Sequence, residues 1–230
     1  MINFNSLLDS TVIHNAGLVL LIWVVGGILF NLIRWRSIIR ASVMQAGPWE
    51  GRGFAAPLKI LGVTLGRDVF LQLDILGCNL RKWVSHLTVF WGFVILGLST
   101  MLNFSVNPTA LPLPLSHAVR VLGNVGGVVF MVGLVLMAYE RVVTPGSMSN
   151  TSFGDAFFIM LLFSAGFTGF MTELASESNM TSTTAVVYWV HLALVASLFI
   201  VAPFSKFVHA LGRVLLRFFE NSERSKKPPQ

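Results

Sequence analysis

The sequence predicts an all-α integral membrane protein, a bundle of five transmembrane helices with the N-terminus outside and the C-terminus in the cytoplasm. Three observations lead to this prediction. The 230 residues are 54% hydrophobic and only 11% charged, and the mean hydropathy is +0.75, which is outside the usual range of soluble domains. Five apolar stretches are each long enough to cross a bilayer. Most basic residues cluster beside the ends of these stretches.

The predicted spans are separated by short connections, with one exception. Residues 1–10 are polar and lack the features of a cleaved signal peptide, so none is expected. The first span ends at Arg34-Trp35-Arg36, an interfacial aromatic residue between two charges. Residues 34–82 are then interrupted repeatedly by Gly and Pro. The five predicted spans are residues 11–33, 83–103, 117–138 or 139, 153–172 and 188–212.

The positions of the basic residues predict the orientation. Of sixteen Lys and Arg, eight lie in residues 34–82 and six in residues 206–227. Because basic residues collect on the cytoplasmic side of membrane proteins, both segments are expected there. The sequence then divides into a transmembrane domain, 1–212, which includes the cytoplasmic loop 34–82, and a basic cytoplasmic tail, 213–230. This placement explains the net charge of +6 by contact with the membrane surface, and no nucleic acid partner is expected.

The long inner segment is expected to have a function. Charged and apolar residues alternate over residues 67–80, which predicts a short amphipathic helix on the inner surface. A connection of this length is unusual in so compact a protein. We expect a docking platform for a cytoplasmic partner, and a solvated loop is the alternative. Residues 104–116 and 173–184 are expected to form external loops.

The five histidines fall into two groups by predicted depth. His86 and His209 are expected at the inner side, and His14, His117 and His191 at the outer side. If residues 188–212 form one helix, the 18 residues from His191 to His209 make five turns. Both imidazoles then lie on one face, about 27 Å apart. Ionisable residues in a span usually mark function, and buried hydrogen bonding is the alternative role.

This pattern favours haem as the cofactor. Cys78 is the only cysteine, which excludes iron–sulfur clusters and thiolate zinc sites held by this chain. Bis-histidine ligation of b-type haem suits electron transfer, and two such haems form a path across a membrane. His86 with His209 is predicted to bind the inner haem. His191 needs a partner for the outer haem, and we prefer His117 to His14.

Other residues have two interpretations each. Arg120, one turn after His117, is either a snorkelling charge or a partner for a haem propionate or a quinone oxygen. Several glycines either let a flat macrocycle approach the backbone or pack helices against each other. These are Gly92, Gly97, Gly123, Gly126 and Gly127.

Two segments resemble a known family of membrane cytochromes. The segment from His191-Leu-Ala-Leu to Ala-Pro-Phe-Ser-Lys-Phe-Val-His209 resembles the last helix of the cytochrome b (gamma) subunit of respiratory nitrate reductases. The segment Arg81-Lys-Trp-Val-Ser-His86-Leu-Thr-Val-Phe-Trp-Gly-Phe resembles the second helix of the wider family. That family includes the membrane cytochromes of heterodisulfide reductases and of the sulfite-reductase-associated complex.

The sequence departs from the pattern of the nitrate reductase branch at one position. The nitrate reductase branch is expected to carry a further histidine ten residues after the first one in the second helix, and Leu96 stands there. The pattern is therefore closer to the heterodisulfide-reductase-like or sulfur-metabolism branch, and His117 is positioned to replace the missing ligand.

The resemblance implies a function as well. It implies a dihaem cytochrome b subunit of an oxidoreductase complex, embedded in the lipid of the plasma membrane. Such a subunit transfers electrons between a quinone or methanophenazine pool and a cytoplasmic iron–sulfur or reductase subunit. A nitrate reductase gamma subunit proper, a single-haem variant and a non-redox membrane anchor are the alternatives.

Overall fold

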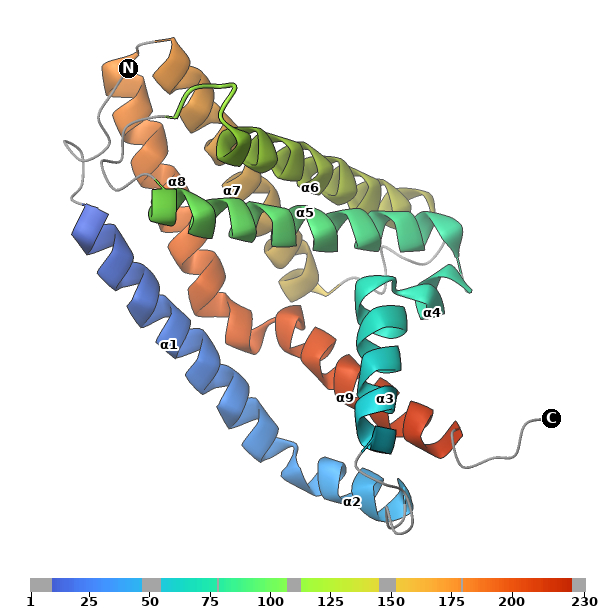
Figure 1. Cartoon of the computed structure of the whole chain (residues 1–230). Coiled ribbons are helices and arrows are strands. Elements are labelled where there is room, and N and C mark those ends of the chain that lie inside the picture. The colour runs from blue at the N-terminus through green and yellow to red at the C-terminus, as the bar shows by residue number, and fades with distance from the viewer. Residues whose placement is uncertain are drawn as a thin grey trace. The chain divides into compact units, whose positions relative to one another are not determined.

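All regular structure in the described part of the chain is helical. The computed structural model describes residues 10–46, 55–77, 79–106, 113–144, 152–178 and 180–224, and these ranges contain no strand. Five of their helices are long and apolar enough to cross a membrane. The all-α class is therefore confirmed, and the number of candidate spans agrees with the prediction. They are α1 (Ser10–Arg34), α5 (Leu80–Val106), α6 (Ala118–Val143), α7 (Phe153–Glu177) and α8 (Thr181–Val201) (Figure 1).

The chain divides into two compact units. The first unit comprises Met1–Ile22 and Val84–Val201, and so contains the beginning of α1, most of α5, and all of α6, α7 and α8. The second unit comprises Trp23–Trp83 and Ala202–Gln230. It contains the end of α1, the connection to α5, and the C-terminal segment.

Glycines bring α5 and α6 into close contact in the first unit. A Cβ atom added to Gly92 would lie 2.5 Å from the backbone nitrogen of Phe130. A Cβ atom added to Gly133 would lie 2.6 Å from the backbone nitrogen of Val89. Small residues let the backbones of membrane helices approach closely, and these glycines do so here.

The same holds for most of the glycines considered above for contact with a macrocycle. Added Cβ atoms on Gly123, Gly126 and Gly127 would come within 2.6–2.8 Å of side chains of Ser99, Ile95 and Phe170, whereas Gly97 has nothing within 4 Å. The structure therefore favours helix packing as the role of these glycines, Gly97 excepted.

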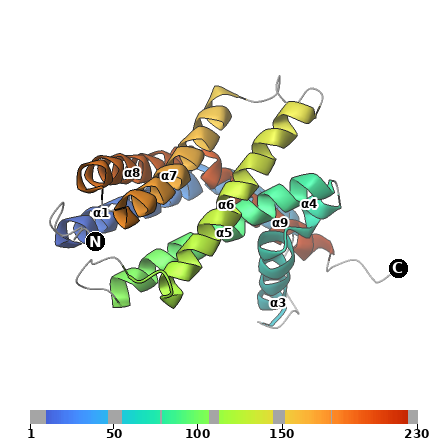
Figure 2. The same ribbon diagram turned by 90° about the horizontal axis from the view of Figure 1, so that it is seen from above.

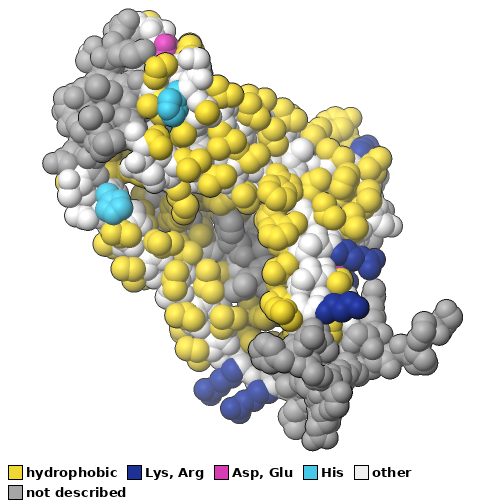
Figure 3. Space-filling model, viewed as in Figure 1, with side chains coloured by type: hydrophobic (Ala, Val, Ile, Leu, Met, Phe, Trp, Pro, Cys, Tyr) yellow, Lys and Arg dark blue, Asp and Glu magenta, His cyan; other side chains and the backbone are white. Residues whose placement is uncertain are grey.

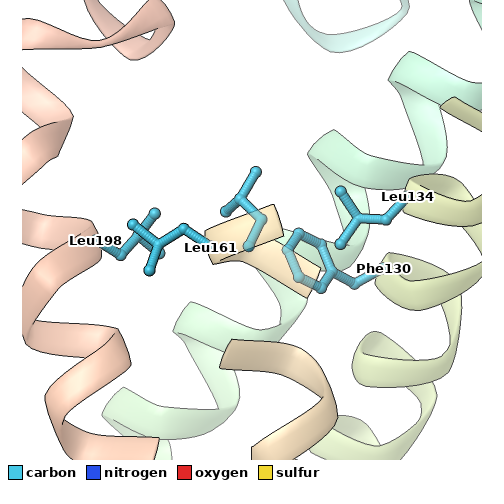
Figure 4. Packing of buried hydrophobic residues seen from close by; sticks show 5 residues of the cluster. Phe130, Leu134, Leu161 and Leu198 are labelled. Atoms are coloured by element: carbon cyan, nitrogen blue, oxygen red, sulfur yellow. The ribbon is translucent and has the colours of Figure 1, made fainter. Parts of the chain in front are cut away.

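The buried core of the first unit lies where α6, α7 and α8 meet. Phe130 and Leu134 of α6 pack against Leu161 and Leu162 of α7 and Leu198 of α8 (Figure 4). α7 and α8 lie side by side in both ribbon views (Figures 1 and 2). Apolar side chains on the outer faces of these helices are expected to contact lipid, so their exposure is ordinary for a membrane protein.

The connection between α7 and α8 is shorter than the sequence predicts. Residues 173–184 are expected to form an external loop, but α7 continues to Glu177 and α8 begins at Thr181. That expectation is wrong because the acidic residues have partners inside the bundle. Glu173 and Glu177 both pair with Arg120 of α6.

The second unit is also more helical than predicted. α2 (Arg36–Ala46) follows α1, and α3 (Ala55–Val63) continues into a π-helix, η2 (Thr64–Phe70), and the short α4 (Leu73–Leu76). The prediction of one amphipathic helix over residues 67–80 is wrong. Gln72 has a φ of 49°, which a right-handed helix does not allow, and it separates η2 from α4.

The predicted fifth span is interrupted at Pro203. α8 ends at Val201, the 3₁₀ turn η3 covers Ala202–Phe204, and α9 (Lys206–Arg224) follows. Proline lacks a backbone N–H and its ring clashes with the preceding helical turn, so the α-helix stops. The expectation that one continuous helix carries His191 and His209 on the same face is therefore wrong.

The end of α1 supplies a polar partner for this interruption. Nδ2 of Asn31 donates to the carbonyl oxygen of Pro203 at 3.0 Å and to that of Gly27 at 2.8 Å. Trp23 and Phe204 add an edge-to-face ring contact with centroids 6.0 Å apart. Carbonyl groups freed within a membrane need such partners, so these contacts stabilise the break.

Ion pairs connect α9 with α4. Arg213 and Arg217 both pair with Asp74, whose side chain is only 9% exposed. Burial alone would lower the pKa of Arg217, but the carboxylates of Glu220 and Asp74 outweigh it and raise that pKa. The raised pKa favours the charged form of Arg217 in this cluster.

Hydrogen bonds connect α9 with η2. Nδ2 of Asn221 donates to Oδ2 of Asp68 at 2.8 Å and to Oγ1 of Thr64 at 3.0 Å. The segment predicted as a basic tail, 213–230, is thus a packed helix as far as Arg224. Residues 225–230 lie outside the described ranges.

The two units differ in charge. The second unit holds fourteen of the sixteen Lys and Arg and five of the ten Asp and Glu, a net charge of +9, and the first unit has a net charge of −3. In Figure 3 the visible Lys and Arg gather mainly at the end of α1 and around α3 and α4, whereas hydrophobic side chains cover the long helices. The side of the membrane on which the second unit lies, and the orientation of the termini, stay predictions.

Candidate functional site

The five histidines belong to five different segments. His14 lies in α1, His86 in α5, His191 in α8 and His209 in α9, and His117 directly precedes α6. The side chain of His209 lies outside the described residues, so the inner pair, His86 with His209, stays a prediction. The described residues contain no group of three or more His, Cys, Asp or Glu that could hold a metal ion, but axial ligation of haem needs only two histidines.

His191 has the surroundings that suit a haem ligand. Its Nδ1 lies 3.0 Å from the carbonyl oxygen of Ala165 and 3.2 Å from Oγ1 of Thr168, both in α7. A carbonyl oxygen only accepts, so Nδ1 carries the proton and donates it, and Nε2 keeps its lone pair. Metal-ligating histidines commonly bond their other nitrogen to a backbone carbonyl in this way. His191 therefore fits an axial ligand that binds through Nε2.

Two small residues of α7 shape the space around this ring. A Cβ atom added to Gly169 would lie only 3.2 Å from Cε1 of His191. The hydroxyl of Thr168 donates to the carbonyl of Ser164 at 2.8 Å, so towards His191 it acts as an acceptor. Sequence analysis assigned α7 no role in ligation because it contains no histidine. The signal in the sequence for its contact with His191 was the adjacent pair of Thr168 and Gly169 within an apolar span.

His191 lies at the centre of its helix. The predicted span 188–212 places it near the outer end, but α8 runs from Thr181 to Val201, which leaves ten residues on either side. The polar stretch from Thr181 to Thr184 is helical rather than part of a loop, so His191 lies further from the start of its helix than predicted. Its placement at the outer side of the membrane stays a prediction.

His117 serves as the N-cap of α6. It has an extended backbone, with φ −68° and ψ 130°, and its Nδ1 accepts a hydrogen bond from the backbone N–H of Val119 at 3.3 Å. In a neutral imidazole whose Nδ1 accepts, the proton is on Nε2, and that nitrogen is then a donor rather than a metal ligand. Capping is thus a sufficient structural role for this residue.

α7 relates the levels of His117 and His191. His191 contacts Gly169 of α7, and the next residue, Phe170, packs against Gly127 of α6. Gly127 follows His117 by ten residues, which is about 15 Å along a helix axis. The pairing of His117 with His191 stays a prediction.

The remaining histidines differ in exposure. His86 is half-buried in α5, next to the fully buried Ser85. His14 is exposed and makes an edge-to-face contact with Phe104, with ring centroids 6.3 Å apart. His14 therefore lies beside the C-terminal end of α5, and its placement at the outer side stays a prediction.

Arg120 is engaged by acceptors of the protein itself. Its Nε donates to Oε1 of Glu173 at 2.9 Å, Nη2 to Oε1 of Glu177 at 2.7 Å, and Nη1 to the carbonyl of Leu113 at 2.5 Å. Nδ2 of Asn124 donates to the same Glu173 oxygen at 2.9 Å. The predicted contact of Arg120 with a propionate or a quinone oxygen stays a prediction. What the structure shows is a polar network between α6 and α7.

Replacing Arg120 by Leu is expected to destabilise the bundle by about 3 kcal/mol, because Glu173 and Glu177 lose their charge partner between packed helices. Breaking a buried ion pair typically costs about 3 to 5 kcal/mol. We expect the low end of that range because the side chains of Glu173 and Glu177 are 25% and 30% exposed. Unfolding in mixed detergent measures it. Adding Glu173→Gln and Glu177→Gln to Arg120→Leu should recover most of the loss. Equal stability of Arg120→Leu and the parent chain contradicts this account.

A shallow groove lies on α6 beside this network. It is lined by Asn124, Val125, Val128 and Val129 and has a volume of about 280 Å³. The side chains of Val125 and Val128 are 53% and 54% exposed, so the groove opens to the surroundings of the helix.

The comparisons with known proteins give no further guide. No protein family, curated protein or solved structure matches this chain.

Proposed function

We propose that this chain is a membrane cytochrome b subunit that transfers electrons between a quinone-type carrier and a cytoplasmic iron–sulfur or reductase partner. The proposed carrier is a quinone or methanophenazine, and the proposed location is the plasma membrane. A b-type haem, when bound, supplies a one-electron redox centre.

One observation carries the proposal. At the centre of a membrane-spanning helix, the Nδ1 of His191 is bonded to the Ala165 carbonyl, and Nε2 has no hydrogen-bond partner among the described residues. A neutral imidazole with one nitrogen bonded to a carbonyl and the other free is oriented for an axial bond. Ionisable side chains at this depth usually serve function. His86 and His209 remain the other proposed ligands. Ligation by His117, which the sequence predicts, is tested by a variant below.

The charge of the second unit supports a cytoplasmic partner. Its net charge of +9 would attract an acidic surface and raise the rate of association. The same charge favours the inner leaflet, where anionic lipids lie. This is the basis for proposing a cytoplasmic second unit and an external N-terminus.

A second candidate function, a non-redox membrane anchor, has its own support. His117 is accounted for as an N-cap. The glycines considered for contact with a macrocycle, Gly97 excepted, face neighbouring helices. In an anchor, the histidines would only satisfy hydrogen bonds within the bundle.

The haem content separates the two candidates. A pyridine haemochrome assay on the purified chain, normalised to protein, is expected to give two haems b per chain if both proposed pairs bind, and one if a single pair binds. No haem in a correctly assembled preparation would assign the chain to the anchor function.

The role of His117 is tested by His117→Asn. Asparagine is a good N-cap residue, so this variant keeps the cap of α6 and removes only the imidazole. We expect the haem content to stay the same, because Nδ1 of His117 already accepts from Val119. Loss of one haem at unchanged thermal stability would instead make His117 a ligand.

A further inference from the structure

We propose that one face of α1 and α2 binds a single anionic phospholipid, with its phosphate at Arg36 and Arg40 and an acyl chain along Leu29 and Ile33. This inference goes beyond the proposed electron-transfer function and does not depend on haem. It requires that α1 crosses the membrane, for which the helix is long and apolar enough.

The opposite side of α1 packs within the second unit. Gly27 and Asn31, one turn apart, both lie against Pro203, and Nδ2 of Asn31 donates to the Pro203 carbonyl at 3.0 Å. One turn further, the ring of Trp35 lies 3.1 Å from the position of a Cβ atom added to Gly212 of α9. Residues four positions apart share one side of a helix. These contacts therefore fix which side of α1 is turned towards α9 and which side is open.

The open side carries exposed residues spaced by four, three and four positions. We call this set the lipid face, and it consists of Leu29, Ile33, Arg36 and Arg40. Backbone hydrogen bonds of 2.9 Å from the N–H of Trp35 to Asn31, and to the carbonyl of Trp35 from Ile39, continue the helical spacing from α1 into α2. Residues at this spacing lie on one helix face. Leu29 and Ile33 are 54% and 62% exposed.

The two arginines of the lipid face have no charge partner in the described part of the chain. Arg36 and Arg40 are both exposed, and neither makes an ion pair or a hydrogen bond with a described residue. The sequence has no Asp or Glu between Asp9 and Glu50. Arg36 and Arg40 are one turn apart, about 6 Å along the axis. Because guanidinium groups bind phosphate oxygens through paired N–H groups, a phosphate is the ligand that suits this pair.

The apolar half of the lipid face selects a lipid over a free phosphate or an acidic protein. Hydrophobic side chains cover α1 in Figure 3, and Lys and Arg side chains lie at its end. A phospholipid matches this order because its acyl chains follow its phosphate towards the membrane interior. A free phosphate or an acidic protein would leave Leu29 and Ile33 unused. The cationic headgroup of phosphatidylcholine would meet the same arginines, so a lipid with a net negative charge is favoured.

The test titrates the purified chain in neutral detergent with phosphatidylglycerol and counts bound lipid by native mass spectrometry, with phosphatidylcholine as the comparison. We expect one phosphatidylglycerol per chain to bind about tenfold more tightly than phosphatidylcholine. Arg36→Gln and Arg40→Gln should each weaken that binding about fivefold, which is the contribution of one basic residue near an anionic surface. The double variant should weaken it about 25-fold, the product of the two.

The matched control is Arg34→Gln. Arg34 is exposed and also has no partner among the described residues, so this variant removes the same charge from the same end of α1. Arg34 lies about 100° around the helix from Ile33 and therefore outside the lipid face. Its replacement should leave the affinity for phosphatidylglycerol unchanged.

Four results overturn the site. The absence of saturable binding would assign the arginines to an acidic protein partner, and equal affinity for the two lipids would exclude selection by charge. An equal loss in Arg34→Gln and Arg36→Gln would mean diffuse attraction to the basic end of α1. Displacement of the lipid by inorganic phosphate would mean that the acyl chain contributes nothing. Haem content, assayed on the same preparations, tests the electron-transfer function separately, and lipid binding in a chain without haem would keep the site.

Discussion

The His191→Ala variant is expected to lose one haem b per chain completely. Its Nδ1 bond to the Ala165 carbonyl leaves Nε2 as the nitrogen available to iron, and alanine offers no replacement. The bundle itself should persist, because His191 is half-buried and lies outside the core cluster of Phe130, Leu134 and Leu198. The haemochrome assay and the reduced minus oxidised spectrum measure the loss.

Two controls separate ligation from general damage at this site. Thr168→Val removes the hydroxyl near Nδ1 but keeps the Ala165 carbonyl, so the haem should remain. His14→Ala removes an exposed imidazole, and no change in haem content is expected unless His14 is the outer ligand. Full haem content in His191→Ala would contradict the assignment of His191.

The Gly92→Val variant is expected to prevent α5 and α6 from packing. Even a Cβ atom at this position would lie 2.5 Å from the backbone nitrogen of Phe130 and 2.6 Å from its Cα. Backbone atoms cannot rotate away as a side chain can, so the two helices must separate. We expect a cost at or above the upper end of the range for overpacking, about 3 kcal/mol. The yield of monodisperse protein after detergent extraction, and its thermal unfolding, measure this effect.

Gly97→Val is the matched control for this prediction. Gly97 lies on the same helix, and a Cβ atom there meets no atom within 4 Å. Both variants carry the same change in helix propensity. The difference between their yields and unfolding temperatures therefore measures the effect of the contact with α6. Similar yields and unfolding temperatures for the two would show that the α5–α6 contact is not close.

The spans could be predicted from sequence because length and hydropathy decide them directly. Each of the five predicted spans corresponds to one observed apolar helix. Their ends were less predictable, because they depend on partners from other helices. Glu173 and Glu177 resemble loop residues until Arg120 is known to pair with both. α8 also begins earlier than predicted, at Thr181, which shifts His191 to mid-helix.

The histidines show a second limit of prediction from the sequence. Their residue type and spacing indicated function, but a spacing of 18 residues predicts one face only if the helix is continuous. Pro203 lies between His191 and His209 and was a visible signal against continuity. The capping role of His117 depends on its backbone conformation. The hydrogen bond from His191 to Ala165 involves a backbone carbonyl, which leaves no trace in residue type.

The arrangement around His191 also provides a way to recognise distant relatives. The ring needs a backbone carbonyl one turn before a glycine, and any larger residue at position 169 would crowd Cε1. A glycine at position 169, followed by a histidine in the next span, is therefore a local signature of this geometry. Chains that keep the glycine and the histidine together, or lose them together, would indicate a shared function even where overall similarity is too low to detect.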